Sequence, residues 1–335
     1  MPKGLDIGTM NIVSAKPKDG QIDLTKQRNL FVEVEYSDIA EKMLSRSNVL
    51  YIKNGKKVYI VGEDALNFAN IFNKETRRPM NAGILSRKEK DAIPMIRLIV
   101  ERVVGAPHKK GEHVYFTCPA KPVDAPIDTL YHQKTLEAIL HNMGYNAHAI
   151  NEGMAVVYSE LADSSFTGLG VSFGAGMTNA CLSYYAVPVT QFSVARGGDW
   201  IDNSVAQATG TPVDRVTAAK ERDFRLDASS HLGELQGALA VYYDNLLEYV
   251  VRGLERQTRD AKVQEDLEIP CVITGGTAAP KGFRQAFEAK LREADLPFRV
   301  KSVSEARHPL YSVARGALVA AQAEEGDHHH KDSKK

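Results

Sequence analysis

The sequence predicts an α/β protein built from two similar halves. Three observations support this prediction. Strand-like and helix-like segments alternate along the 335 residues, and each half opens with a strand, a glycine turn and a second strand. The length also fits about two domains. Two halves of this kind predict a cleft in which one ligand is held from both sides.

The first half mixes strands and helices in a readable order. After a short strand and a glycine turn, "NVLYIKNGKKVYIVGEDAL" predicts a hairpin with a type I′ turn at Asn54-Gly55, which forms a small insert. "DAIPMIRLIVERVVG" repeats apolar residues at helical spacing and stops at Gly105. "EHVYFTCPAKP" then predicts a strand, and "DTLYHQKTLEAILHNMGY" a helix that ends at Gly144.

The second half repeats this pattern. "FTGLGVSFGAGMTNACLSYYAVPVTQFSVARGG" predicts two or three strands around glycine turns, followed by a helix that begins near Asp199. "ELQGALAVYYDNLLEYVVRGLERQTRD" predicts a long amphipathic helix, and "IPCVITGG" a short buried strand. The halves therefore have corresponding elements.

Composition limits the classes of function. Lys+Arg and Asp+Glu both number 42, so no overall field favours nucleic acid or an anionic membrane. Cys118, Cys181 and Cys271 lack zinc-site spacing and lie in apolar runs, which predicts buried cysteines in a reducing compartment. No apolar run approaches the roughly 18 residues of a membrane span. We expect a cytoplasmic protein without direct membrane binding.

Three motifs identify a superfamily. "LDIGTMN", "GVSFGAGMTN" and "VITGGTAAPKGF" occur in that order and resemble the two phosphate loops and the adenosine loop of the actin-like ATPase superfamily. "VYIVGEDAL", "RRPMNAGIL", "AINEGMAVV", "RGGDWIDNSV" and "HPLYSVARGALVA" resemble most closely the bacterial actin homologues of the rod-shape (MreB) type. The resemblance implies a two-lobed actin-like ATPase fold, with duplicated ribonuclease-H-like domains and a nucleotide cleft between the lobes.

The two glycine turns have the composition of phosphate cradles. Glycines at positive φ let backbone N–H groups approach phosphate oxygens, which is the role expected of Gly8, Gly174 and Gly176. By resemblance the phosphate-binding residues are Gly8, Thr9, Met10, Asn11, Ser172, Gly174, Ala175, Gly176, Met177 and Thr178. Asp6 precedes the first loop and is the catalytic acid expected to hold Mg²⁺ through water, because Mg²⁺ keeps several waters and takes few protein ligands.

Glu152 begins a helical run after a short apolar strand. It occupies the position of the superfamily's water-orienting acid, and the resemblance therefore implies a catalytic role. A glutamate that favours a helix start is the alternative. The family usually has proline where this chain has Gly153, which is expected to loosen the turn.

Ser172 is the main departure from the family pattern. The second loop of the family has an acid at this position and two threonines after its glycines, whereas this chain has Ser172, Met177 and Thr178. Removal of a carboxylate weakens metal organisation more than phosphate capture by backbone groups. We therefore expect ATP or ADP to bind and hydrolysis to be slow.

The base and ribose are assigned by resemblance. Gly275, Gly276, Thr277 and Lys281 belong to the adenosine loop, in which glycines let the backbone approach the nucleotide. Lys220 and Glu221 lie where the family places a Lys/Glu pair near the ribose and base. A solvated helix face is the alternative for this pair.

These residues give an expected organisation and function. Domain I comprises residues 1–148 plus 306–325, with a small insert at about 30–75; domain II comprises 149–305; a disordered polar tail covers 326–335. The resemblance implies a bacterial actin-like protein that polymerises with itself, with cytoskeletal or cell-envelope proteins as further partners and no nucleic acid. We expect a weak ATPase with ATP/ADP and Mg²⁺ as cofactors.

Two other functions fit the same fold. A non-polymerising actin-like ATPase would use the same cleft, and a degenerate nucleotide-binding scaffold would bind a partner without turnover. A sugar kinase would need a catalytic acid facing a small-molecule pocket and usually a longer chain.

Overall fold

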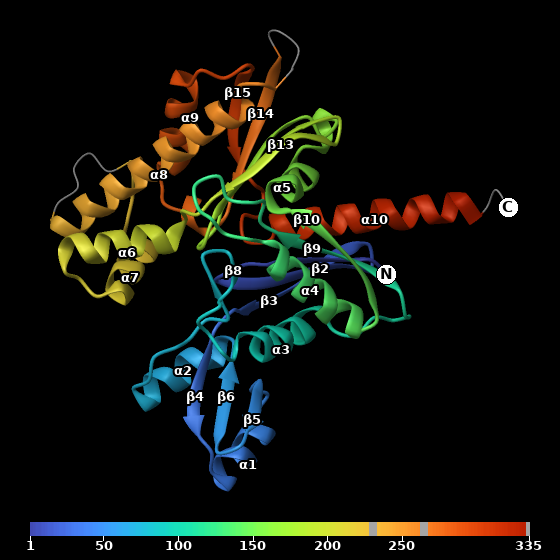
Figure 1. Ribbon diagram of the computed structural model, residues 1–335, viewed down its shortest axis with the longest axis vertical. Helices are drawn as coiled ribbons and strands as arrows, with labels where there is room; N and C mark the ends of the chain where they lie inside the picture. Colours follow the sequence, from blue (N-terminus) through green and yellow to red (C-terminus); the bar gives the residue numbers. More distant parts are fainter. Residues whose placement is uncertain (228–232, 262–266, 333–335) are drawn as a thin grey trace.

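Two five-stranded sheets form the centre of the protein in the computed structural model, which describes residues 1–227, 233–261 and 267–332 (Figure 1). In each sheet, three strands form an antiparallel meander, and two later strands join parallel to the first. Both sheets therefore have the same topology, and the predicted duplication of an α/β unit is confirmed.

The first sheet has the order β10-β9-β1-β2-β3. Its strands are β1 (Lys3–Ile7), β2 (Asn11–Lys18), β3 (Gln21–Arg28), β9 (Glu112–Cys118) and β10 (Tyr145–Asn151). The helices α3 (Ala92–Val104) and α4 (Leu130–Asn142) pack against this sheet. Gly105 and Gly144, at φ +69° and +96°, stand where these two helices end, as predicted.

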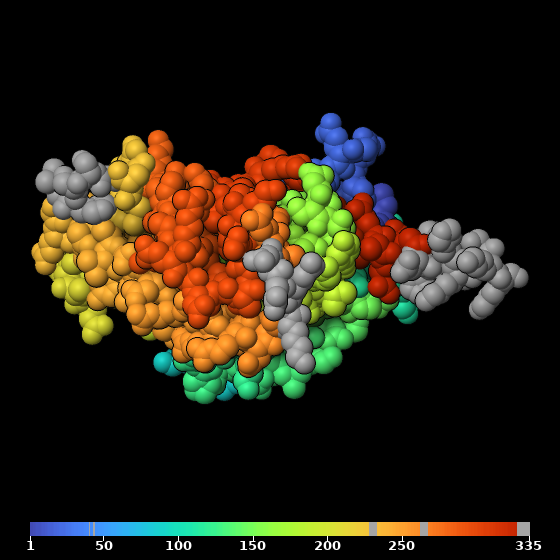
Figure 2. Space-filling view, turned by 90° about the horizontal axis from the view of Figure 1, so that it is seen from above, coloured from blue at the N-terminus to red at the C-terminus, as the bar shows by residue number. Residues whose placement is uncertain are grey.

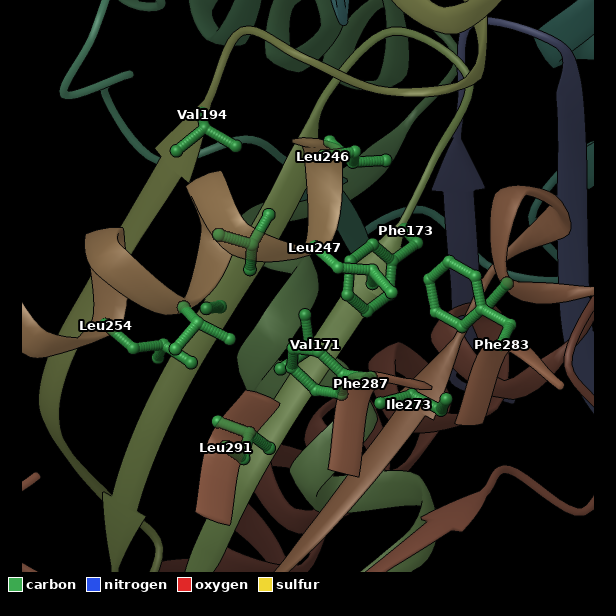
Figure 3. Close-up of a cluster of buried hydrophobic side chains, with 14 of the residues drawn as sticks. Val171, Phe173, Val194, Leu246, Leu247, Leu254, Ile273, Phe283, Phe287 and Leu291 are labelled. Atoms are coloured by element: carbon green, nitrogen blue, oxygen red, sulfur yellow. The ribbon is translucent and has the colours of Figure 1, made fainter. Parts of the chain in front are cut away.

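The second sheet has the order β13-β12-β11-β14-β15. Its strands are β11 (Gly168–Phe173), β12 (Thr178–Tyr184), β13 (Val187–Val194), β14 (Glu268–Thr274) and β15 (Arg299–Glu305). Its helices are α6 (Gly198–Thr209), α7 (Val213–Arg222), α8 (Glu234–Thr258) and α9 (Phe283–Glu293). Figure 3 shows buried side chains that α8, α9 and this sheet contribute to one cluster: the ring of Phe173 in β11 meets those of Phe283 and Phe287 edge-on, at centroid distances of 4.8 and 5.3 Å.

The predicted insert is a separate three-stranded sheet at the lower end of the view in Figure 1. It contains β4 (Phe31–Glu35), α1 (Asp38–Arg46), β5 (Tyr51–Asn54), β6 (Lys57–Val61) and α2 (Glu63–Phe72). The hairpin turn was predicted one residue too early. Asn54 pairs with Lys57, and of the two turn residues only Gly55 has positive φ, at +60°, which is typical of a type II′ turn.

The helices α5 (Glu152–Glu160) and α10 (Ser312–Asp332) pack together between the sheets. They approach so closely that a Cβ on Gly316 would lie 1.7 Å from the carbonyl oxygen of Ala155. Gly153 has the same role on the other side of α5, since its Cβ would lie 2.6 Å from the N atom of Cys181 in β12. Glycine at position 153 therefore permits this close packing of α5 against β12.

The C-terminal segment continues α10 as far as Asp332, where a disordered tail over 326–335 was expected. The run of alanine and glutamate before Gly326 favours a helix, and no proline interrupts it. Residues 333–335 lie outside the described part of the chain. Seen from above, elements of the C-terminal half, drawn in yellow to red, cover most of the visible surface (Figure 2). Among the described helices, none is long and apolar enough to cross a membrane.

Candidate functional site

A cavity of about 770 Å³ lies between the two sheets and is lined by residues of both. Nearly all of the predicted site residues meet there, although they come from distant parts of the chain. The lining includes Asp6, Gly8, Thr9, Met10, Asn11, Glu152, Ser172, Gly174, Ala175, Gly176, Met177, Lys220, Glu221, Gly275, Gly276, Thr277 and Lys281. Thr178 does not line the cavity. Its buried hydroxyl donates a hydrogen bond to the carbonyl of Arg196 at 2.9 Å.

The two glycine turns have the same hydrogen bond. The N–H of Gly8 donates to the carbonyl oxygen of Asn11 at 3.0 Å, and that of Gly174 donates to Met177 at 3.0 Å. Each turn joins the first two strands of its sheet. The duplication of the fold therefore places two equivalent turns on opposite sides of one cavity.

The second turn is held by its carbonyl groups. The carbonyl of Gly174 accepts hydrogen bonds from the N–H of Gly198 at 3.1 Å and from the hydroxyl of Thr277 at 2.8 Å. The carbonyl of Ala175 accepts from the N–H of Asp199 at 2.8 Å. Among the described residues, the N–H groups of Ala175, Gly176 and Met177 have no hydrogen-bond acceptor. A run of free N–H groups beside a cavity is the usual basis of an anion site.

The loop glycines are required for close approach. Gly8, Gly174 and Gly176 are not among the residues with positive φ, so the conformation expected for them is wrong. Instead, a Cβ on Gly176 would lie 2.2 Å from the N atom of Gly83 and 2.5 Å from Oγ1 of Thr9. Gly275 does have positive φ, at +100°.

Asp6, the residue before the last of β1, lines the cavity. Its Oδ1 accepts a hydrogen bond from Oγ1 of Thr117 at 2.9 Å, and the same oxygen of Thr117 accepts from the N–H of Ile7 at 3.1 Å. Thr117 therefore fixes Asp6 from the neighbouring strand β9. Burial raises the pKa of Asp6 to about 6, although the bond from Thr117 favours the carboxylate.

Glu152 is the first residue of α5, and the side chain of Asn151 caps this helix by accepting from the N–H of Met154 at 3.3 Å. The Oγ of Ser172 donates a hydrogen bond to Oε2 of Glu152 at 3.2 Å. Burial raises the pKa of Glu152 to about 8, and the nearby charge of Asp6 acts in the same direction. Two mutually repelling acids therefore face the cavity, and Ser172 contacts one of them.

The residues expected near the base and ribose differ in how they are held: Lys220 is hydrogen-bonded to its neighbours, whereas Glu221 is exposed. Lys220 of α7 points toward α6: its Nζ donates to Oδ2 of Asp202 at 2.7 Å and to the carbonyl of Gly198 at 3.1 Å. Only 10% of the Lys220 side chain is exposed, so it supports the wall of the cavity. Glu221 is exposed. The carbonyl of Lys281 accepts from the N–H groups of Leu226 and Asp227, which joins the adenosine-like turn to the segment that follows α7.

A short hairpin from the first half reaches across to the second half. It consists of β7 (Met80–Asn81) and β8 (Ile84–Leu85). The N–H of Gly83 donates to Oγ1 of Thr9 at 3.2 Å. Just before the hairpin, Nη1 of Arg78 donates to both carboxylate oxygens of Asp199, at 2.9 and 3.0 Å. The pair has no local signal in the sequence, because 121 residues separate its members.

Two cations of β3 were also missed. Lys26 and Arg28 line the cavity on the side of the first sheet. Their alternation in "TKQR" was the available signal, because residues two apart in a strand share a face. The turn between the predicted strands β12 and β13 exposes two apolar side chains, Tyr185 and Val187, at 64% and 63%.

The fold is similar to solved structures of actin-like proteins. A MamK double helical filament matches with a TM-score of 0.70 and 18% identity, covering 96% of this chain and 98% of that chain. MreB 5 of Spiroplasma citri bound to AMPPNP matches with a TM-score of 0.65 and 11% identity, covering 98% of both chains. The ethanolamine utilization protein EutJ from Carboxydothermus hydrogenoformans matches with a TM-score of 0.53 and 16% identity, covering 95% and 88%.

These matches confirm the predicted actin-like ATPase fold from end to end. No protein of curated function matches the sequence. The sequence profile of one family, described as Volactin, matches residues 1–321. The chain therefore belongs to the volactin family.

Proposed function

We propose that this protein binds ATP and ADP in the cavity between its two sheets, polymerises into filaments and hydrolyses ATP slowly. The observation that carries the proposal is the pair of equivalent glycine turns on opposite walls of one cavity. A ligand bound between them contacts both halves, so it favours one relative position of the halves over others.

The phosphates would lie between the two glycine turns. The free N–H groups of Ala175, Gly176 and Met177 support this assignment, and the turn at Gly275 and Gly276 would approach the ribose and base. Two similar structures add support, since both contain bound AMPPNP, an ATP analogue: MreB 5, and a non-polymerising MamK mutant.

The cavity fits a hydrated Mg²⁺ ion. Within the described residues, no three histidine, cysteine or acidic side chains are grouped as a complete metal site. Mg²⁺ commonly retains waters and takes only one or two carboxylates together with substrate phosphates. Asp6 would hold the ion through water, and a cation there would relieve the repulsion between Asp6 and Glu152. When bound, the ion would neutralise phosphate charge.

Glu152 would orient the attacking water. Its place at the start of a capped helix fixes the carboxyl group, and the hydroxyl of Ser172 holds Oε2. Ser172 supplies a neutral hydroxyl where an acid would help to organise the metal's waters. We therefore propose that phosphate capture is retained and that the hydrolytic step is slow.

Polymerisation is proposed from the fold and from its similarity to MamK in a double helical filament. The free, buried cysteines agree with a cytoplasmic location.

The proposed boundary between the two domains shifts by a few residues. Because β10 belongs to the first sheet, domain I comprises residues up to Asn151 plus 306–325.

Thermal melting with ATP and Mg²⁺ tests the nucleotide site. A ligand that binds only the folded protein raises the melting temperature as its concentration rises. A rise with ATP and with ADP is expected. An unchanged melting temperature at millimolar ATP would contradict nucleotide binding and favour a scaffold without nucleotide.

A further inference from the structure

Lys26 and Arg28 form a pair of cations at one wall of the cavity. They are two residues apart in β3 and so share one face of the first sheet. Lys26 lies opposite Val13, which in turn lies opposite Asp6. Lys26, Val13 and Asp6 therefore lie side by side on three neighbouring strands.

The register places both cations beside the first glycine turn. Neighbouring strands lie about 4.8 Å apart, so the backbone of Lys26 is about 10 Å from that of Asp6. The long lysine side chain covers much of this distance. Arg28 lies directly opposite Asn11, the last residue predicted for the turn. Both side chains line the cavity together with Glu152 and Ser172.

The charges of these two residues are weakly satisfied. Nε of Arg28 is buried without a hydrogen-bond acceptor among the described residues. Its ion-pair partner there is Glu63, with Nε and Oε2 3.6 Å apart and 61% of the Glu63 side chain exposed. In the same described ranges, Lys26 has no ion pair.

Two of the other cations that line the cavity already have close carboxylate partners. Lys220 is paired with the buried carboxylate of Asp202 at 2.7 Å, and Arg225 with Asp227 at 2.9 Å.

The remaining two lining cations, Arg222 and Lys281, belong to the second half, at the end of α7 and after the turn at Gly275 and Gly276. Lys26 and Arg28 are the lining cations on the strand next to the first glycine turn, and they are therefore better placed to bind an anion held at that turn. The free N–H groups of the second glycine turn line the same cavity, which suggests that the anion is phosphate.

We propose that Lys26 and Arg28 bind phosphate oxygens of the nucleotide and supply part of the neutralising charge that a metal ion would otherwise provide. This inference rests on the proposed nucleotide site. An arginine can bind phosphate through two N–H groups, and lysine acts as a point charge. The cavity lacks an acid at position 172 and has two cations on β3, and both differences make its charge more positive. Both make nucleotide binding less dependent on Mg²⁺.

Equilibrium binding of ATP to the full chain, measured by isothermal titration calorimetry in Mg²⁺ and in EDTA, tests this proposal. The wild type is expected to bind in EDTA within about tenfold of its Kd in Mg²⁺. Lys26→Gln and Arg28→Gln should each raise the Kd in EDTA by about ten- to a hundredfold, as expected for loss of a charge-assisted hydrogen bond. The increase should be smaller in Mg²⁺.

Lys18→Gln is the matched control, because Lys18 is an exposed cation at the far end of the same hairpin. It should bind like the wild type. Circular dichroism melting of each variant establishes that it is folded. Wild-type affinity in both folded variants, or wild-type binding that is abolished by EDTA, would overturn this inference and leave the nucleotide site standing. Absence of ATP binding by the wild type in both buffers would overturn the proposed function as well.

Discussion

The hydroxyl of Ser172 donates a hydrogen bond to Oε2 of Glu152, 3.2 Å away, from one glycine-rich strand end to the start of α5. The bond favours the carboxylate form of Glu152. Burial and the charge of Asp6 oppose it and raise the pKa of Glu152 to about 8. Position 172 therefore contacts the residue proposed to orient water, in addition to its proposed effect on a metal ion.

Ser172→Asp should accelerate ATP hydrolysis. A carboxylate at this position would organise the waters of Mg²⁺, and we expect phosphate release to rise by at least about tenfold. Phosphate release at saturating ATP and Mg²⁺ measures the effect. Ser172→Asn, which adds a polar group of similar size without charge, should remain slow. Equal rates for the wild type and Ser172→Asp would contradict the role assigned to Ser172.

Glu152→Gln should lower hydrolysis while retaining nucleotide. The amide keeps the size of the side chain and cannot accept a proton, so the rate should fall by at least about a hundredfold. ATP affinity should change little, because the loop N–H groups remain. Single-turnover hydrolysis and equilibrium binding separate the two effects. Unchanged hydrolysis would assign Glu152 to helix initiation alone.

Gly176→Ala should push the second glycine turn away from Gly83 and Thr9, which belong to the first half. The new Cβ would lie 2.2 Å from the N atom of Gly83 and 2.5 Å from Oγ1 of Thr9. Overpacking of this kind costs about 1–3 kcal/mol of folding free energy, and ATP affinity should fall with it. Gly237→Ala is the control: nothing lies within 4 Å of its Cβ, and alanine favours the helix by about 0.5–1 kcal/mol. Equal melting temperatures and ATP affinities for the two variants would contradict the close contact.

Arg78 and Asp199 should be energetically coupled. Their side chains are 33% and 23% exposed, so a coupling of about 0.5–1 kcal/mol is expected, and it should weaken with salt. A double-mutant cycle of Arg78→Ala and Asp199→Asn, read out as ATP affinity, measures it. Each single variant should bind ATP more weakly, because the pair joins the two halves. Strictly additive effects would show that the pair does not favour closure.

His132 should make stability dependent on pH. Burial lowers its pKa to about 4 from an ordinary value of 6.5, so the unfolded chain binds the proton more readily. The associated stability is complete above pH 6.5 and is lost as the pH falls toward 4, by on the order of 3 kcal/mol.

His132→Asn tests this prediction, because Nδ1 of His132 accepts from the N–H of Leu85 at 3.2 Å and an asparagine oxygen can take that place. Urea unfolding of both proteins from pH 7 to pH 4 measures the difference. The variant should lose less stability over this range. Parallel curves would contradict the assigned role of the buried imidazole.

The sequence predicted those parts of the fold that depend on local pattern. Glycine turns between strands identified the two phosphate-like loops, and helical periodicity with Gly105 and Gly144 gave the helices and their ends. The hairpin at Gly55 was located to within one residue. Its turn type was wrong, because strand register decides which residues occupy the turn.

Features that depend on tertiary register were not predicted. Arg78 and Asp199 meet only after both halves have folded. Lys26 and Arg28 alternate visibly in the sequence, but the pairing of β3 with β2 decides which face they occupy. The glycines of the loops were explained by backbone freedom, whereas the structure shows close approach at Gly176. Contact with a distant segment has no local sequence signal.

The central claim is that nucleotide bound between the two halves controls assembly. Its most direct test is sedimentation of the purified full chain with ATP and Mg²⁺, with ADP and without nucleotide, followed by negative-stain electron microscopy of the pellets. The account predicts filaments with ATP that persist long after its addition, because hydrolysis is slow. Soluble monomers at every protein concentration, in the presence of bound ATP, would contradict it and favour a non-polymerising actin-like ATPase.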